Sequence, residues 1–157
     1  MTTIVKVGKA IAIDSRITEN GIVLDDDFRK YAEDENNVYL FTGSMCNFEE
    51  MAELYSSNSM AEKPDLFIDT TMLAFNKQSG NVTQIRTDKN TKALKVSPVS
   101  CHTYCVGSGR KYAYGVVSYI QDSESSMTDE SIAKMAIQSA SKHDLYTCDN
   151  IKTWSAC

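Results

Sequence analysis

Two short apolar runs, separated by a two-residue turn, open the chain. The runs are TTIVKV (residues 2–7) and AIAID (residues 10–14), with Gly8 and Lys9 between them. Apolar runs of this length on either side of a glycine-containing turn predict a β-hairpin. Such a hairpin must bury one face against another sheet and the other against helices, which restricts the fold to layered architectures.

Further strands are predicted by the same signals. GIVL (21–24) and FRKYAE (28–33) are expected to pair across the acidic turn DDD, and VYLFT (38–42) is expected to form a strand that ends at Gly43. A loop is predicted over residues 56–65. The later predicted strands are LFIDTTMLAFN (66–76) and VTQIRT (82–87), joined as a hairpin through KQSGN, then HTYCVGSG (102–109), and a short strand or tail NIKTW (150–154).

Three helices are predicted from capping residues and apolar periodicity. The first begins at Asn47, with Glu50 as its capping-box partner. The second follows the GSG turn, and the third is capped by Thr128. The predicted apolar faces are Phe48, Met51, Ala52 and Tyr55 in the first helix, Tyr112, Val116, Tyr119 and Ile120 in the second, and Ile132, Met135, Ala136 and Ala140 in the third.

The order of these elements predicts the fold class. Strand runs are interrupted by helix runs without a regular β–α alternation, which favours α+β. A four-layer α–β–β–α sandwich satisfies the burial that the hairpins require. The length of 157 residues is consistent with a single domain over residues 1–157.

Composition excludes several function classes. A net charge of −5 disfavours binding to a nucleic-acid backbone. No apolar run approaches the roughly 18 residues of a membrane span, and the start of the chain lacks a signal-peptide pattern, so a cytoplasmic protein is expected. The cysteines have irregular spacing that predicts free thiols rather than a zinc site or disulfides, and no metal or cofactor is expected. They are Cys46, Cys101, Cys105, Cys148 and Cys157.

The second residue, Thr2, could combine two catalytic groups. Thr2 is small, so Met1 is expected to be removed by methionine aminopeptidase. Thr2 would then carry a free α-amine beside its own hydroxyl, so that one residue holds both a base and a nucleophile.

Six landmarks in order along the chain resemble those of proteasome β-subunits and HslV-type peptidases. TTIVKV resembles a mature HslV N-terminus, and DSRIT (14–18) resembles the Asp-Ser-Arg-x-Thr signature of the proteasome. The other four are Lys30 at its spacing of sixteen from Asp14, FTGS (41–44), VGSGRKYAYGVV (106–117) and DLYT (144–147). The chain therefore resembles the N-terminal-nucleophile hydrolases over nearly its whole length.

The resemblance implies a catalytic centre at the N-terminus. Thr2 would supply Oγ as the nucleophile and its α-amine as the base. Lys30 would lower the pKa of that amine by like-charge repulsion and stabilise a developing alkoxide. Asp14 would pair with Lys30 and keep it charged. From the residues alone, Asp14 and Lys30 could also be a cross-strand pair on the surface.

The same resemblance assigns supporting roles. Gly43 would donate its N–H to the oxyanion, although a strand-end glycine with positive φ is the alternative. Ser108 would hydrogen-bond the Thr2 amine, or instead cap the following helix. Asp144 and Thr147 would orient Ser108 and Thr2, or form a polar loop.

A pocket for an apolar substrate residue is predicted on the residues Ile17, Phe28, Ala32 and Met45. His102 and His143 fit no catalytic spacing.

One departure bears on assembly and partners. The family has two long helices between the oxyanion turn and the middle hairpin, whereas only one short helix fits between Asn47 and Leu66. This predicts a reduced helix layer on one face and puts an ATPase unfoldase cap in doubt. The expectation is a homo-oligomeric threonine peptidase or amidohydrolase acting on peptides or unfolded polypeptides. The alternative is a catalytically silent protein that assembles or binds a partner.

Overall fold

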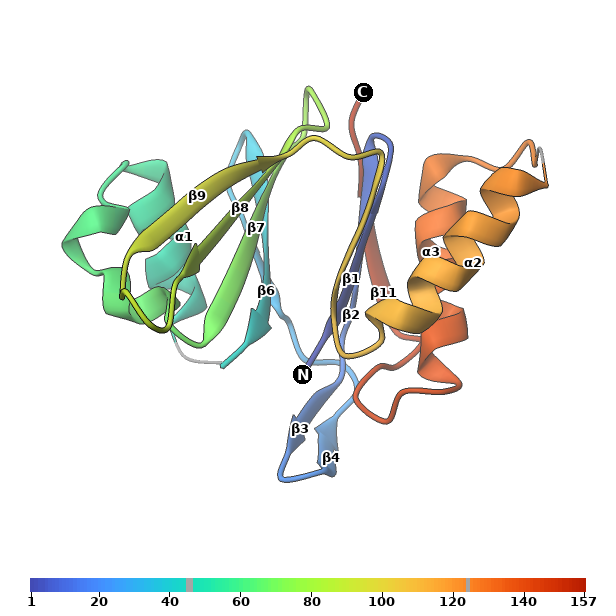
Figure 1. The fold of residues 1–157 in the computed structure, drawn as a ribbon, viewed down its shortest axis with the longest axis horizontal. Coiled ribbons are helices and arrows are strands. Elements are labelled where there is room, and N and C mark those ends of the chain that lie inside the picture. The colour runs from blue at the N-terminus through green and yellow to red at the C-terminus, as the bar shows by residue number, and fades with distance from the viewer. Residues whose placement is uncertain (45–46, 124) are drawn as a thin grey trace.

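Two β-sheets face each other in the computed structural model, which describes residues 1–44, 47–123 and 125–157 (Figure 1). The first sheet contains, in spatial order, β10 (Thr103–Gly107), β1 (Thr3–Val7), β2 (Ala10–Asp14) and β11 (Ile151–Ser155). The second contains β5 (Tyr31–Glu33), β6 (Asn37–Gly43), β7 (Thr70–Asn76), β8 (Val82–Thr87) and β9 (Leu94–Val99). Neighbouring strands in both sheets are antiparallel.

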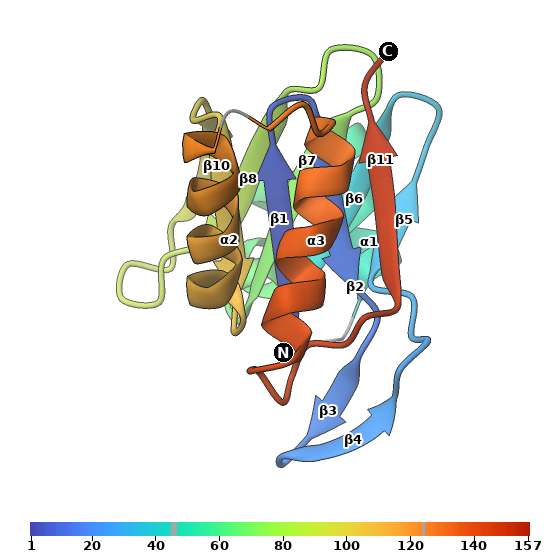
Figure 2. The same ribbon diagram turned by 90° about the vertical axis from the view of Figure 1, so that its right-hand side faces the viewer.

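Helices cover the outer faces of both sheets. Figure 2 shows α2 (Arg110–Asp122) and α3 (Asp129–Ser141) lying over the first sheet. The second sheet is covered by α1 (Phe48–Ser56) and two short 3₁₀ turns, Met60–Glu62 and Pro64–Phe67. The predicted four-layer sandwich with a thin helix layer on one side is therefore confirmed. None of the helices in the described ranges is long and apolar enough to cross a membrane.

Side-chain alternation along the strands builds the layers. In β1, Ile4 packs between the two sheets, whereas Val5 and Val7 pack against α2 and α3. The layer between the sheets consists of the buried residues Ile4, Ile11, Ile13, Val38, Leu40, Leu73, Phe75 and Val82. Because successive strand residues point to opposite faces, these rows also decide which way the residues at the strand ends point.

The hairpin predicted across the DDD turn is wrong. Instead, β4 (Ile22–Asp25) pairs with β3 (Ile17–Glu19), while β5 joins β6 in the second sheet. The reason is the Asn20-Gly21 pair, whose positive φ values of 49° and 80° suit the tight turn of a two-residue hairpin.

Of the two predicted helix caps, one is absent and one is present. Asn47 adopts a left-handed conformation with φ 67° and forms no side-chain cap, so the predicted capping box is absent, and Glu50 pairs with Lys63 instead. In contrast, Thr128 caps α3 as predicted, because its hydroxyl accepts a hydrogen bond from the Ser131 N–H at 3.2 Å.

The buried face of α2 is rotated from the predicted one. Ala113, Val117 and Ile120 are buried, whereas Tyr112 and Tyr119 are 45% and 75% exposed. Small alanines of α3 pack against α2, so the helices pack through their smaller side chains and the tyrosines remain outside. In α3, Met135 of the predicted face is likewise exposed, while Ile132, Ala136 and Ala140 are buried.

Strand β9 was not predicted. It contains Pro98 and forms the edge of the second sheet, where it pairs with β8 alone. Proline is tolerated on an edge strand because no outer neighbour needs its missing N–H, but it weakens the strand signal in a sequence.

Candidate active site

The two threonines after Met1 have separate surroundings. Ile4 faces the layer between the sheets, so alternation directs Thr2 to the same side and Thr3 towards the helices. The Thr3 hydroxyl accepts a hydrogen bond from the Gly109 N–H at 2.9 Å and lies 2.6 Å from the Thr147 hydroxyl. Thr3 is thus part of the support behind the strand, and Thr2 is the threonine on the inner face.

A buried ion pair lies beneath the N-terminus. Lys30 Nζ donates to Asp14 Oδ1 at 3.0 Å and to the carbonyl oxygen of Arg16 at 2.9 Å. The side chains of Lys30 and Asp14 are only 1% and 0% exposed, so the surface-pair alternative does not hold. Asp14 also accepts the backbone N–H groups of Thr3 at 2.7 Å and Arg16 at 3.0 Å, which fixes its carboxylate to the strand end.

The pKa values of Lys30 and of the Met1 amine both lie below their ordinary values. Burial lowers the pKa of Lys30, and the Asp14 carboxylate opposes that shift. Burial and then the Lys30 ammonium lower the pKa of the Met1 α-amine below its ordinary value of 8.0. The carboxylates of Asp14 and Asp144 oppose this shift. The amine therefore lies within the electrostatic field of the ion pair.

Asp144 joins three hydroxyl groups into one network. The Ser108 and Thr147 hydroxyls donate to Asp144 Oδ2 at 2.6 and 2.5 Å. Because Thr147 has a single hydroxyl proton and gives it to the carboxylate, Thr3 is the donor in the Thr3–Thr147 bond. The network therefore runs from the Gly109 N–H through Thr3 and Thr147 to Asp144.

Ser108 connects this network to the N-terminal strand. Its backbone N–H donates to the carbonyl oxygen of Thr2 at 3.1 Å. The N-cap of α2 is Gly109, which has no side-chain cap, so the Ser108 hydroxyl serves Asp144 rather than the helix.

Gly43 sits at the end of β6 in a conformation that excludes other residues. Its φ is 114°, and a Cβ at this position would overlap the carbonyl oxygen of Asp69. That carbonyl already accepts the Ser44 N–H at 2.9 Å. A glycine is required here whether or not its N–H serves as an oxyanion donor, and that role remains a prediction.

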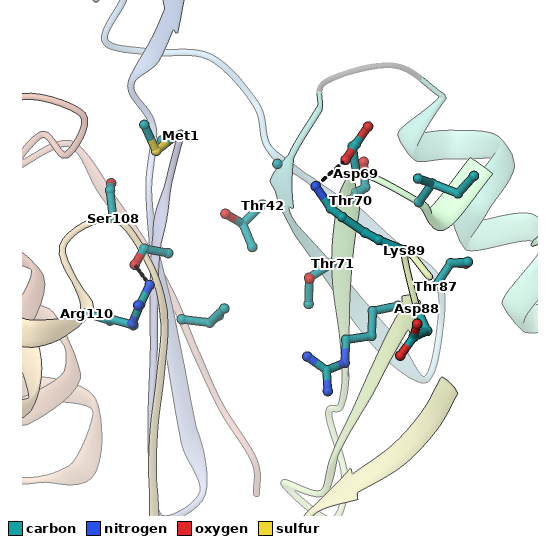
Figure 3. A pocket seen from close by; sticks show the side chains of 15 residues that line it. Met1, Thr42, Asp69, Thr70, Thr71, Thr87, Asp88, Lys89, Ser108 and Arg110 are labelled. Carbon is teal, nitrogen blue, oxygen red and sulfur yellow. Dashed lines mark hydrogen bonds and ion pairs between the residues drawn. The ribbon is translucent and has the colours of Figure 1, made fainter. Parts of the chain in front are cut away.

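A pocket of about 510 Å³ opens between the ends of the two sheets (Figure 3). It brings Gly43 and Ser108 to the same space as Met1, so two of the predicted landmarks, FTGS and VGSGRKYAYGVV, line the pocket beside the first residue of the chain. Its lining residues are Met1, Thr42, Gly43, Ile68, Asp69, Thr70, Thr71, Arg86, Thr87, Asp88, Lys89, Val106, Gly107, Ser108 and Arg110.

The residues predicted to form the apolar substrate pocket are not gathered in that space. Phe28 and Ala32 line a neighbouring pocket of about 470 Å³ with residues of the α1 N-terminus. Ile17 is buried in β3 and lines neither pocket. Met45 lies outside the described residues.

No histidine side chain belongs to the described network of this centre, whereas the Cys148 N–H donates to Asp14 Oδ2 at 3.4 Å. The His143 ring lies 5.2 Å from that of Tyr112, and the His102 carbonyl accepts the Lys6 ammonium. Burial raises the pKa of Cys105 to about 12, which keeps it a thiol. Cys101, Cys105, Cys148 and Cys157 are free, and Cys46 lies outside the described residues. Within the described ranges, no group of three or more metal-binding side chains occurs.

Two positioning residues were missed by sequence reasoning. Thr3 could have been found from the alternation of β1, which separates it from Thr2. Arg16 could not, because its partners are distant in sequence: its guanidinium binds Asp26 at 2.6 Å and the carbonyl oxygen of Leu145 at 2.9 Å. Arg16 thus ties the β3–β4 hairpin to the loop after α3, while its own carbonyl holds Lys30.

Comparisons with known proteins agree with this architecture. No family model matches the sequence, and no curated protein matches it. Among solved structures, HslV from Trypanosoma brucei is similar with a TM-score of 0.72 and 16% identity, over 97% of each chain. BPH from Thiobacillus denitrificans in complex with epoxomicin has a TM-score of 0.71 and 17% identity, over 98% of this chain and 96% of BPH. A second BPH structure has a TM-score of 0.69 and 18% identity, over 98% and 95%. The chain therefore has the N-terminal-nucleophile hydrolase fold shared by HslV and BPH, as its sequence landmarks predicted.

Proposed function

We propose that this protein is an N-terminal threonine peptidase, or a related amidohydrolase, in which Thr2 is the nucleophile once Met1 is removed. The observation that carries the proposal is the buried Asp14–Lys30 pair at the N-terminal strand. Lys30 lowers the pKa of the Met1 amine, and we expect it to act likewise on the Thr2 amine once Met1 is removed. Burying the Lys30 ammonium carries a desolvation cost, and a lysine with a purely structural role would have no need to lie beneath the N-terminus.

In the proposed reaction, the neutral amine of Thr2 takes the proton from Thr2 Oγ while Oγ bonds to the substrate carbonyl carbon. The Gly43 N–H stabilises the resulting oxyanion. The leaving amine takes up the proton and departs, which leaves an ester on Thr2. Water then loses a proton to the same amine, attacks the ester and restores the free hydroxyl.

The network around Asp144 supports this centre from behind. Asp144 receives hydrogen bonds from Ser108 and Thr147, and Ser108 N–H holds the carbonyl of Thr2. These bonds restrain the N-terminal strand, so the nucleophile needs little reorganisation before it attacks. In the proposed mechanism, Ser108 would receive or return a proton beside the amine.

Peptides or unfolded polypeptides are the proposed substrates, and a homo-oligomer is the proposed assembly. The fold shared with HslV, and the epoxomicin bound to BPH, support a peptide ligand. An ATPase cap is the weaker part of the proposal, because α1 and two short turns replace a layer of longer helices.

Covalent labelling of Thr2 tests the proposed function. Protein without Met1 is expected to form an adduct with epoxomicin or a peptide β-lactone, mapped to Thr2 by peptide mass spectrometry. Protein that retains Met1, and Thr2→Ala, should form none, because an amide nitrogen cannot act as the base. Thr3→Ala should still form the adduct at Thr2, since Thr3 faces the helices, but more slowly, because the Thr3 hydroxyl belongs to the network behind the strand. An adduct at another residue would overturn the Thr2 mechanism, and no adduct on fully processed protein would favour the silent alternative.

The adduct rate is also expected to depend on pH in a defined way. The amine must be neutral to act as a base, and burial and Lys30 lower the pKa of the Met1 amine below 8.0. After Met1 removal the terminal amine is one residue further inward, so we expect the same two effects to lower its pKa. The rate should therefore fall as pH decreases, with a midpoint below 8.0. A midpoint at or above 8.0, measured by intact-mass kinetics across a pH series, would contradict the proposed base.

A further inference from the structure

The rows of side chains that face the space between the sheets change from apolar to polar and charged residues at the pocket. In β8 the inner row is Val82, Gln84 and Arg86, because Val82 lies in the inter-sheet core and alternate residues share a face. In β10 the corresponding row includes Tyr104 and Val106, which pack against the same core. Both rows run towards the end of the sandwich that carries Gly43 and Ser108.

A cross-sheet hydrogen bond separates the apolar core from the pocket. Gln84 Nε2 donates to the Tyr104 hydroxyl at 2.7 Å, which links the two sheets. Arg86 is the next inner residue beyond this bond and lines the pocket. Arg110, at the start of α2, lines the opposite wall beside Ser108 (Figure 3).

The charges of the pocket do not balance. Asp69 pairs with Lys89 at 2.8 Å, and Asp88 pairs with Lys95 at 2.6 Å, so both acidic residues of the lining have cationic partners. The hydrogen bond from Lys95 is the main reason that the pKa of Asp88 lies below its ordinary value.

The two arginines have no such partners. Within the described residues, neither Arg86 nor Arg110 forms an ion pair with a carboxylate. Arg110 donates only to the carbonyl oxygen of Gly107, at 3.2 Å, and both side chains are exposed. A protein with a net charge of −5 thus presents two guanidinium groups without carboxylate partners in the pocket that Met1, Gly43 and Ser108 line.

We propose that Arg86 and Arg110 bind acidic side chains of the substrate, so that the enzyme selects peptides with Asp or Glu close to the cleaved bond. This inference rests on the proposed function for the identity of the bond that is cut. The guanidinium group presents a planar set of donors that matches a carboxylate, and such charge-assisted pairs are stronger than neutral hydrogen bonds. The arginines lie on opposite walls, so one extended peptide could contact both.

Binding to an inactive variant tests the preference without catalysis. Thr2→Ala protein is titrated against fluorescent peptides of identical length that carry Asp, Asn or Lys at positions flanking the expected bond, and binding is followed by anisotropy. The Asp peptide should bind about tenfold more tightly than its Asn counterpart, as expected for hydrogen bonds between charged groups. The difference should shrink between about 50 mM and 500 mM salt, because screening strengthens with ionic strength.

Charge-removing variants assign the preference to the arginines. In the Thr2→Ala background, Arg86→Gln and Arg110→Gln should each reduce the Asp-over-Asn ratio, and the double variant should bring it to about one. Lys152→Gln removes the same charge from the exposed strand β11 and is the control that should leave the ratio unchanged. Thermal melts confirm that each variant is folded.

The outcomes separate this inference from the proposed function. Equal binding of Asp and Asn peptides, no binding of either, or a preference that survives the double variant would overturn the acidic specificity even if Thr2 forms its adduct. An Asp preference that the double variant removes, in protein whose processed form makes no adduct, would support the binding site and reject the peptidase. Cleavage of a mixed peptide library by active protein, with Asp or Glu enriched near the cut, would support both.

Discussion

Replacing Lys30 with methionine is expected to abolish adduct formation at Thr2 and to lower the free energy of unfolding by about 3–5 kcal/mol. The adduct rate should fall because the variant lacks the Lys30 charge, which lowers the pKa of the Met1 amine and is expected to lower that of the Thr2 amine after processing. The effect on stability follows from burial, because the Asp14 carboxylate is fully buried and would lose its only side-chain counter-charge among the described residues. Methionine is chosen because it fills a volume similar to that of lysine.

The two effects are measured separately. Denaturant unfolding gives the stability change, and intact-mass kinetics at a temperature well below the melting transition give the adduct rate. Lys77→Met is the matched control, since Lys77 pairs with Glu33 at 2.9 Å and both side chains are 34% exposed. That variant should lose at most about 1 kcal/mol and react normally. A folded Lys30→Met protein with a near-native adduct rate would remove Lys30 from the mechanism.

Gly107→Ala is expected to have the second largest effect. Gly107 has a φ of 102°, and an added Cβ would overlap the carbonyl oxygen of Thr2. Left-handed strain and overpacking each cost about 1–3 kcal/mol, so a loss of about 4 kcal/mol is expected. The clash also displaces the backbone of Thr2 from Ser108, and misplacement of a reacting group by about 1 Å can cost about 100-fold in rate.

A second glycine in the same motif provides the control. Gly115 lies in α2, and an added Cβ there meets nothing within 4 Å. Gly115→Ala should therefore raise the free energy of unfolding by about 0.5–1 kcal/mol, as expected for a helix interior. Thermal melts and adduct kinetics on both variants check the pair. Equal behaviour of the two alanine variants would show that the contact between Gly107 and Thr2 is not required.

Local signals accounted for the elements whose partners are close in sequence. The β1–β2 hairpin needs only Gly8 and two apolar runs, and the α3 cap needs only Thr128 and an N–H three residues away. The spacing of Asp14 and Lys30 carried the resemblance, but their burial could not be derived from it. The same lysine–aspartate spacing occurs whether the pair is exposed on the surface or buried beneath a strand.

Elements that depend on distant neighbours escaped prediction. The sequence does not show that Asn20-Gly21 outcompetes the DDD turn, because both are good turn formers and the choice depends on which strand the second sheet takes as its edge. The buried face of α2 depends on the small side chains of α3, and β9 depends on the edge that β8 offers to it. Each of these outcomes is a choice among local alternatives of similar free energy, made by tertiary packing.

The sequence by itself determined the layered fold, and it predicted that Thr2, Asp14 and Lys30 meet at the N-terminal strand. It could do so because strand alternation, glycine turns and the landmark spacings are properties of short stretches. Only the tertiary structure decided that Asp144 gathers Ser108 and Thr147, and that Arg86 and Arg110 line one pocket. These residues lie on different strands and helices, and their proximity depends on how two sheets pack, which no local pattern encodes.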